Sequence, residues 1–227
     1  MTLVSIVTPT FPDRWHLLSS RCNPSVMQQS WGEELEHVIV SDRNLDRLGV
    51  DFPVLFFGQD VWGKDRYTRI TQINESWRNP LTEASIGAIP WYIGSLLALG
   101  EYIGFLGDDD EYLPDHVARH IATMEETGAD FTVSQVDFRV GGNPYLVIGD
   151  ESFQLGHLDS DGIMCRASAL TVANWSASPQ DSAACDWRLV RDWLNGGLKG
   201  AIVPGGPTAI HHDGWAAGKT GRPDRPR

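Results

Sequence analysis

Apolar runs and amphipathic segments alternate along the first 130 residues of the chain. Short runs rich in β-branched and aromatic residues predict strands at residues 3–8, 36–40, 53–57 and 102–106. The stretch 24–31 reads as the end of a helix, and the stretch 86–99 as a full helix. The segment 114–127 also predicts a helix, because it begins with Pro114 and is followed by Gly128. Strands that alternate with helices are typical of an α/β domain with a mostly parallel central sheet.

The second half of the chain has shorter and more interrupted patterns. Extended runs are expected at residues 131–138, 145–148, 201–203 and 208–211. Helical patterns cover residues 166–173 and 183–194. No internal repeat and no linker divides the sequence, so we expect one domain over residues 1–218.

Composition and charge narrow the possible functions. The chain has 227 residues, with 30 Asp and Glu against 18 Lys and Arg, which gives a net charge of −12. Binding to nucleic acid requires a basic surface and is therefore disfavoured. The segment 219–227 is locally basic and rich in proline, and we expect a disordered tail there, with contact to an anionic partner as the alternative. Three widely spaced cysteines, no signal peptide and no long apolar span favour a cytoplasmic location.

The strongest chemical signal is the acidic run that follows the predicted strand at 102–106. Gly107 is followed there by Asp108, Asp109, Asp110 and Glu111. Ligands of parallel sheets bind beyond the carboxyl ends of the strands, where this run lies. Adjacent carboxylates repel one another, and a divalent cation such as Mg²⁺ or Mn²⁺ compensates that repulsion. The alternative is a solvated acidic loop that begins the next helix.

The first two predicted strands end in residues suited to a nucleotide. The first ends in the run Thr8, Pro9, Thr10 and Phe11, with Arg14 close behind. The second ends next to Asp42, which can accept a hydrogen bond from a nucleobase while Phe11 lies against its ring. A turn or helix-capping aspartate is the alternative for Asp42.

These motifs resemble the family-2 glycosyltransferases of GT-A fold over roughly residues 3–215. The resemblance is carried by VSIVTPTFPDR, SVMQQSW, EHVIVSD and, most specifically, GEYIGFLGDDDEYLPDHV. It implies a Rossmann-like sandwich with a central, mostly parallel mixed sheet. Residues 1–110 would form its nucleotide-binding half and residues 111–218 its acceptor half. It also implies a nucleotide-sugar donor, a divalent metal (Mn²⁺ or Mg²⁺) and inverting transfer to an acceptor hydroxyl.

The sequence departs from the family pattern in two places. The family commonly has an Arg-Asn pair in the helix before the acidic strand, whereas this chain reads AIPWY at residues 88–92. Arg66, Arg69 or Arg78 can replace the missing contact with the pyrophosphate. The first acid of the usual block is Gly107 here, so the metal-binding pattern becomes Asp108-x-Asp110, with Asp109 as an alternative main ligand.

The resemblance also assigns residues in the second half. The segment ACDWRL resembles the one that carries the catalytic base, which makes Asp186 the candidate base; a stabilising aspartate in the first turn of a helix is the alternative. A late histidine completes many metal sites of this fold, and of the adjacent His211 and His212 we prefer His211, with a structural histidine as the alternative. Asp161 is a candidate for sugar hydroxyls, with a turn aspartate equally favoured. Trp91 and Trp187 are further candidates for contact with the sugar or the acceptor. For any single tryptophan, packing in the core is the favoured alternative.

Rival functions lack their motifs. No glycine-rich loop follows the first strand, as a sugar nucleotidyltransferase needs, and no G-x-G-x-x-G follows any strand, as a dinucleotide dehydrogenase needs. We therefore predict a metal-dependent, inverting hexosyltransferase with a UDP-sugar donor, glucose or galactose being the commonest sugars. We expect Asp108 to contact both the nucleotide and the metal. The expected acceptor is a glycan, a protein or a small molecule, and less so a nucleic acid. The alternative function is a non-catalytic nucleotide- or carbohydrate-binding protein derived from the same fold.

Overall fold

The structure is a computed structural model that describes most of the chain. The described residues are 2–10, 12–41, 54–59, 65–72, 88–149, 153–175 and 184–212. Four features of the sequence analysis lie outside them: Phe11, Asp42, Arg78 and the segment 219–227.

An eight-stranded sheet forms the centre of the molecule, with strand order β11-β7-β10-β5-β1-β2-β4-β3. Its strands are β1 (Val4–Thr10), β2 (Leu35–Ser41), β3 (Val54–Gln59), β4 (Asp65–Gln72), β5 (Tyr102–Phe105), β7 (Phe131–Val133), β10 (Ile163–Arg166) and β11 (Gly200–Ile202). The strands β5, β1, β2 and β4 run parallel, and β3 and β10 run antiparallel to their neighbours. The predicted α/β class with a mostly parallel, mixed sheet is confirmed.

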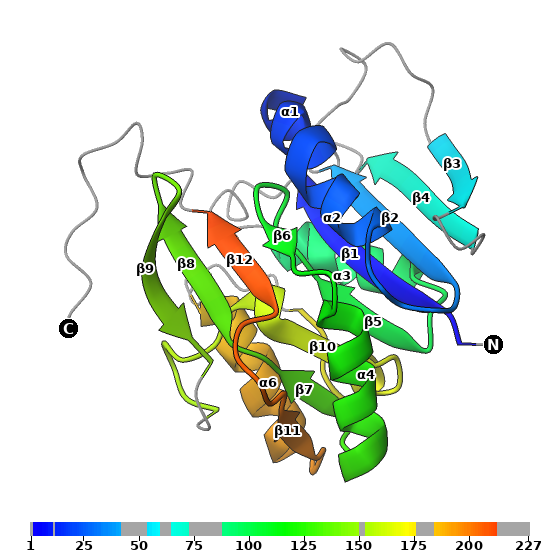
Figure 1. The fold of residues 1–227 in the computed structure, drawn as a ribbon. Coiled ribbons are helices and arrows are strands. Elements are labelled where there is room, and N and C mark those ends of the chain that lie inside the picture. The colour runs from blue at the N-terminus through cyan, green and yellow to red at the C-terminus, as the bar shows by residue number, and fades with distance from the viewer. Residues whose placement is uncertain are drawn as a thin grey trace.

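A second, smaller sheet lies beside the central one, with order β6-β12-β8-β9 (Figure 1). Its strands are β6 (Glu111–Tyr112), β8 (Val136–Val140), β9 (Asn143–Ile148) and β12 (Ala209–His212). β6 follows the acidic run directly, and β12 carries the two adjacent histidines. Pairing between β6 and β12 therefore brings two segments that are distant in the sequence to one place, with Ile210 opposite Glu111.

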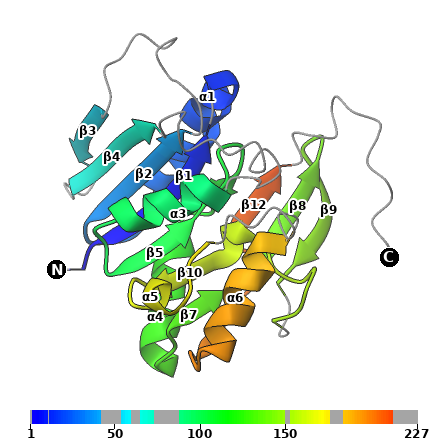
Figure 2. The same ribbon diagram turned by 180° about the vertical axis from the view of Figure 1, so that it is seen from behind.

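Helices cover both faces of the central sheet. α2 (Asn23–Met27) and α4 (His116–Thr127) lie on the face seen in Figure 1, and α3 (Ala88–Leu97), α5 (Ala169–Val172) and α6 (Cys185–Asn195) on the opposite face seen in Figure 2. The short segments η1 (Pro12–Arg14), α1 (Trp15–Leu17) and η2 (Leu18–Cys22) connect β1 to α2. α4 ends at Gly128, whose φ of 65° is in the left-handed region that favours glycine.

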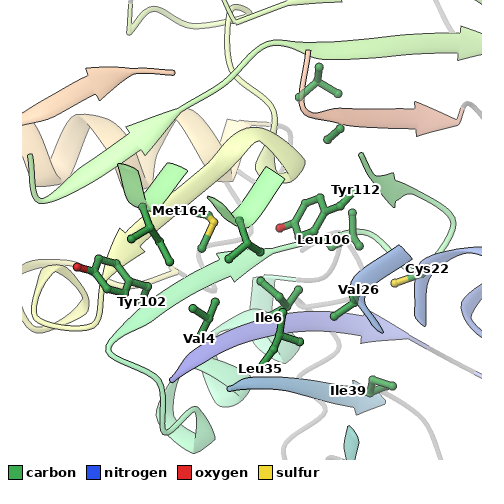
Figure 3. Close-up of a cluster of buried hydrophobic side chains, with 14 of the residues drawn as sticks. Val4, Ile6, Cys22, Val26, Leu35, Ile39, Tyr102, Leu106, Tyr112 and Met164 are labelled. Atoms are coloured by element: carbon green, nitrogen blue, oxygen red, sulfur yellow. The ribbon is translucent and has the colours of Figure 1, made fainter. Parts of the chain in front are cut away.

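Two apolar cores result from this layering. In the first, Val4 and Ile6 of β1 meet Val26 of α2, and the cluster continues to Tyr112 and Met164 (Figure 3). The second lies under α3, α5 and α6. Both cores hold the carboxyl end of β1 and the start of the acidic run in fixed positions.

The structure corrects four details of the expected elements. β1 continues through Pro9, which is paired in register with Val40, rather than stopping there. The stretch 65–72, for which the sequence analysis predicts no strand, is strand β4, which pairs with β2 and buries alternate side chains such as Arg66 and Thr68. The extended run 131–138 is divided between β7 and β8, which belong to different sheets. Residues 163–166, assigned in part to a helix, form β10.

Candidate active site

The acidic run after β5 is buried rather than solvated. Asp108, Asp109 and Asp110 have exposed fractions of 2%, 8% and 3%. Burial of a carboxylate without a partner is costly, so each of these groups requires a donor or a cation. The alternative of a solvated acidic loop is wrong for these three side chains.

The first two aspartates face the end of β1 and the η1 segment. Arg14 donates from Nη1 to Oδ1 of Asp108 at 2.7 Å and from Nη2 to Oδ2 of Asp109 at 2.6 Å. The hydroxyl of Thr10 donates to Oδ2 of Asp108 at 2.9 Å. Arg21 of η2 donates to the main-chain oxygen of Asp109 at 2.6 Å. The structure thus brings together three residues predicted to bind a nucleotide: Thr10, Arg14 and Asp108.

Asp110 points the other way, toward the small sheet. Nδ1 of His211 lies 3.4 Å from Oδ2 of Asp110, 3.3 Å from Oδ2 of Asp161 and 3.6 Å from Oδ2 of Asp159. The main-chain N–H of His212 donates to Oδ1 of Asp110 at 2.6 Å. The His212 ring instead contacts Oε1 of Glu111 at 2.7 Å, on the other face of β12. Of the two adjacent histidines, His211 is therefore the one whose ring faces Asp110, Asp159 and Asp161.

The η6 segment (Ser160–Gly162) positions Asp161. The side chain of Asp159 accepts a hydrogen bond from the main-chain N–H of Asp161 at 3.0 Å, as the N-cap of this turn. Oδ1 of Asp161 in turn accepts from the main-chain N–H of Gly107 at 2.8 Å. The η6 turn and the acidic run are therefore tied together directly.

Mutual repulsion and burial shift the acidities of this cluster. Burial raises the pKa of Asp108 to about 6, although Arg14 opposes the shift. Burial and the neighbouring Asp159 raise the pKa of Asp161 to about 6. Burial opposes protonation of His211, but its hydrogen bonds with Asp159 and Asp161 outweigh burial and raise its pKa to about 12. Burial therefore disfavours the ionised forms of Asp108 and Asp161, and a bound cation would favour them.

A divalent cation fits this cluster. Ligand atoms of Asp110, Asp161 and His211 all lie within 4.8 Å of one another. Carboxylate oxygens suit Mg²⁺ and Mn²⁺, and an imidazole nitrogen is a further ligand that transition metals accept. The ligand atoms gathered here differ in part from the predicted set, because Asp108 and Asp109 face Arg14 and Asp161 joins Asp110 and His211.

Asp186 lies in the first turn of α6, near enough to Asp159 and Asp161 for their charges to act on it. Burial, together with the charges of Asp159 and Asp161, raises its pKa to about 7. Its Oδ1 accepts a hydrogen bond from the main-chain N–H of Trp187 at 2.7 Å. The Trp187 ring is half-buried under the guanidinium of Arg191, whose Cζ lies 5.0 Å from the ring centroid.

Three predicted site residues have other surroundings. Arg66 is buried near the start of β2, where Nη2 donates to the main-chain oxygen of Trp31 at 2.7 Å. Arg69 forms an ion pair with Glu36 and donates to the main-chain oxygen of Leu97 at 3.0 Å. Trp91 is in the core.

The Trp91 ring is stacked on Trp175 at a centroid distance of 4.6 Å. The structure therefore does not bring Trp91, Arg66 or Arg69 to the acid cluster.

Thr8 and Pro9 lie in β1, just before Thr10. The Thr8 side chain is buried, and its hydroxyl lies 2.9 Å from Nε2 of His37. Nδ1 of His37 contacts Oδ1 of Asn23 at 2.9 Å. The contact with His37 therefore holds the end of β1 in place, and the Thr8 hydroxyl is not exposed at the surface of the site.

The sequence analysis missed two residues that contact the acid cluster or His211: Asp159 and Arg21. Asp159 belongs to the D-S-D-G pattern at residues 159–162, and its spacing of two from Asp161 is the signal that could have identified it. Arg21 lies 88 positions from Asp109 in the sequence, and no local pattern connects them.

Comparison with known proteins agrees with this geometry. Residues 90–168, which include β5, the acidic run and η6, match the model of glycosyl transferase family 2. No curated protein matches the chain in sequence. Several solved structures nevertheless share its fold.

The structure of Staphylococcus aureus (S. aureus) TarS residues 1–349 in complex with UDP is similar with a TM-score of 0.65 and 14% identity, over 93% of this chain and 60% of that one. The same protein in complex with UDP-GlcNAc gives a TM-score of 0.62 and 15% identity, over 94% and 59% of the two chains. The mannosyltransferase PcManGT from Pyrobaculum calidifontis, in complex with GDP-Man and Mn²⁺, gives a TM-score of 0.62 and 12% identity, over 94% of this chain and 59% of that one.

The chain thus spans about 60% of the length of these structures. Within the described residues, no helix is long and apolar enough to cross a membrane. Residues 90–168 are therefore similar to glycosyl transferase family 2, and the chain shares the fold of TarS and PcManGT.

Proposed function

We propose that the protein is a metal-dependent, inverting glycosyltransferase that moves a sugar from a nucleotide-sugar donor to an acceptor hydroxyl. The observation that carries the proposal is the convergence of Asp110, Asp161 and His211 beside Asp108 and Asp109 at the carboxyl edge of the sheet. A buried cluster of five aspartates, with Asp159 as the fifth, is suited to a ligand that carries positive charge.

Asp110, Asp161 and His211 would hold Mn²⁺ or Mg²⁺, with Asp108 and Asp109 close by. When bound, such an ion holds a diphosphate and stabilises the negative charge that develops on it as the sugar departs. Pro9, Thr10, Phe11 and Asp42 would surround the nucleoside, and Thr8, buried beside His37, would hold the end of β1 in place.

Asp186 is the proposed base. Its carboxylate would accept the proton of the acceptor hydroxyl as the oxygen attacks the anomeric carbon of the sugar. Attack from the side opposite the departing diphosphate inverts that carbon. The position of Asp186 in the first turn of α6, where the charges of Asp159 and Asp161 act on it, supports this role. Trp187, next in the chain, is the candidate for contact with the sugar or acceptor.

A UDP-sugar is the favoured donor, because an aspartate facing the base suits uridine and TarS has been solved with UDP and UDP-GlcNAc. PcManGT is bound to GDP-Man, so a guanine donor must be included in any test. The acceptor would be a glycan, a protein or a small molecule.

The first experiment measures stabilisation of the protein by UDP-, GDP-, dTDP- and ADP-sugars, with and without Mn²⁺. A ligand at about 100 times its Kd stabilises the folded state by ~2.7 kcal/mol. We expect stabilisation that requires Mn²⁺ and selects one nucleotide. If no donor stabilises the protein in either condition, the proposed function is wrong.

A second experiment separates an enzyme from a binding protein. Asp186→Asn keeps the oxygen that accepts from Trp187 N–H but cannot take up a proton. We expect it to retain donor-induced stabilisation while release of nucleoside diphosphate in the presence of acceptor falls roughly 10²–10⁴-fold. The matched control is Asp192→Asn on the same helix, whose side chain is 42% exposed and paired with Arg191. If Asp186→Asn transfers sugar at the parent rate, Asp186 is not the base.

A further inference from the structure

We propose that a cavity between η2, α2 and β6 is a binding site for a neutral carbohydrate, separate from the site proposed for the donor. The cavity has a volume of about 610 Å³, within the range of about 300–1,000 Å³ that small ligands occupy in proteins. Its walls come from two segments that are far apart in the sequence, residues 20–28 and residues 111–114. In Figure 1, β6 lies between α2 and β12. This inference goes beyond the proposed function, because the cavity can bind a ligand whether or not the protein transfers a sugar.

The acid cluster lies on the other side of the strand pair formed by β6 and β12. Glu111 of β6 lines the cavity, and its Oε1 contacts the ring of His212 at 2.7 Å. The preceding residue of β12, His211, faces Asp110 and Asp161 instead. Because adjacent residues of a strand point to opposite faces, the strand pair separates the cavity from the candidate metal ligands. None of those three ligands lines the cavity.

Three planar polar side chains line the cavity with hydrogen-bonding groups that the described part of the chain does not use. Arg21 donates from Nη1 to the main-chain oxygen of Asp109 at 2.6 Å, and its Nε and Nη2 have no partner among the described residues. The side-chain amide of Gln28 forms no hydrogen bond with them either. Glu111 uses one carboxylate oxygen for His212, which leaves Oε2 for a ligand.

These groups fit a ligand that is rich in hydroxyls. A hydroxyl both donates and accepts, so a sugar hydroxyl can accept from Arg21 and donate to Glu111, and the amide of Gln28 can do both. One cation and one anion line the cavity, so a charged ligand would be repelled by one of them, which favours a neutral ligand. Pro24 and Pro114 add apolar ring surface, against which the C–H groups of a sugar ring can be buried.

A peptide is the rival ligand for a polar cavity of this size. Peptides and proteins usually bind through an aromatic or arginine side chain that fills a well-packed pocket. Tyr112 is the aromatic residue of this wall, but it is only 3% exposed and is stacked on His116 at a centroid distance of 3.5 Å. The wall therefore offers a peptide little apolar surface for an anchor, and a carbohydrate is the favoured ligand.

The backbone supports a functional role for this place. Residues Leu18–Cys22 form a π-helix, and π-helical turns are rare in proteins and frequent at functional sites. This turn supplies Ser20 and Arg21 to the cavity. The unusual turn and the unused polar groups are therefore found at the same place.

The test is a titration of isotope-labelled protein with chitotriose, maltotriose and mannotriose, three neutral trisaccharides, observed by NMR. The side-chain amide of Gln28 and the Nε–H of Arg21 report on the cavity directly. We expect at least one trisaccharide to shift both signals, with a Kd on the order of 1 mM. No donor and no metal are added, so the result does not depend on the proposed donor site.

Two variants of Gln28 show whether the ligand lies in the cavity. Gln28→Ala removes the amide, and we expect the Kd of the bound trisaccharide to rise about 3–10-fold, the size of one lost hydrogen bond. Gln28→Trp fills the cavity and should abolish the shift of the Arg21 signal. The matched control is Gln154→Ala, which changes an exposed glutamine that does not line the cavity and should leave the Kd unchanged.

The proposal is overturned if no trisaccharide at about 20 mM shifts the two signals, or if both variants bind the trisaccharide as the parent does. It is also overturned if inorganic phosphate or triglycine shifts the signals as strongly as the trisaccharides, because the site would then be one for anions or peptides. Donor-induced stabilisation without trisaccharide binding would refute the second site alone. Trisaccharide binding without donor-induced stabilisation would refute the proposed function alone.

Discussion

His37 offers the sharpest test of how the protein supports the end of β1. The side chain is fully buried in β2, between Asn23 of α2 and Thr8 of β1. The hydroxyl of Thr68 also donates to Oδ1 of Asn23, at 3.3 Å. Because that amide oxygen only accepts, Nδ1 of His37 carries the proton and Nε2 accepts from the hydroxyl of Thr8. The network requires a neutral imidazole, and the perturbation we choose is His37→Gln.

The magnitude follows from the pKa of this group. Burial lowers the pKa of His37 from 6.5 to about 3. In the unfolded chain the imidazole takes up a proton as the pH falls below 6.5, whereas the folded protein does not until about pH 3. Stability contributed by the neutral imidazole is therefore complete above pH 6.5 and lost progressively below it. Between pH 7.5 and pH 5 the loss is about 2 kcal/mol, at 1.36 kcal/mol for each pH unit.

The assay is urea unfolding of parent and variant at pH 7.5 and pH 5. Other buried groups also change protonation, but they are common to both proteins and cancel in the difference. At pH 7.5 we expect His37→Gln to be less stable by about 1–3 kcal/mol, because its polar partners lose their bonds. At pH 5 that difference should shrink by about 2 kcal/mol.

The control is His16→Gln, since His16 is exposed on α1 and keeps its contact with water on folding. A difference between parent and His37→Gln that is the same at both pH values would refute the reasoning.

Two further predictions test the residues around the acids. In Gly107→Ala the new Cβ would lie 2.3 Å from Oδ2 of Asp110, so we expect Mn²⁺ affinity to fall roughly 10–100-fold. The control is Gly32→Ala, where nothing lies within 4 Å of the new Cβ, and its Mn²⁺ affinity should stay unchanged. In Arg69→Met the buried carboxylate of Glu36 loses its cation, so we expect urea unfolding to show a free energy of unfolding lower by about 3 kcal/mol. The Kd of the folded protein for its donor should stay unchanged. A weaker affinity for the donor would show that Arg69 does belong to the nucleotide site.

Much of the fold could be predicted because its strands and helices are locally encoded. The run at 102–106 is apolar throughout, as a strand buried on both faces must be, and the segment 114–127 carries its own start and stop signals. β4 was missed because its polar and charged residues, Arg66 among them, find partners elsewhere in the fold. Those partners, the main-chain oxygens of Trp31 and Glu33, lie on a different segment and leave no local pattern.

The site could be predicted where its residues follow a strand and not where tertiary pairing assembles it. Thr10 ends β1, and the acidic run closely follows β5. Both therefore lie at the carboxyl edge of the sheet, where ligands of parallel sheets bind. The grouping of Asp110 with Asp161 and His211 depends on the pairing of β12 with β6 and on the hydrogen bond from Gly107 to Asp161. Neither contact has a signature in the sequence, because each joins segments 50 or more positions apart.

The sequence at residues 88–92 has no Arg-Asn pair like that of the family it resembles, and the packing of α3 gives a reason. Ala88 and Pro90 are buried at the start of this helix, and Trp91 is stacked on Trp175 in the second core. A charged side chain at these positions would be removed from water, so this end of α3 serves packing instead of phosphate binding. Of the substitutes expected from the sequence, Arg66 and Arg69 hold the framework of β2 and β4.

Arg14 differs from both, because its charge already lies against the acids that a metal and a diphosphate would share. Of Arg14, Arg66 and Arg69, Arg14 is therefore the one whose position agrees with the proposed contact with a diphosphate. The guanidinium lies at the carboxyl edge of the sheet, where its charge already offsets part of the negative charge of Asp108 and Asp109.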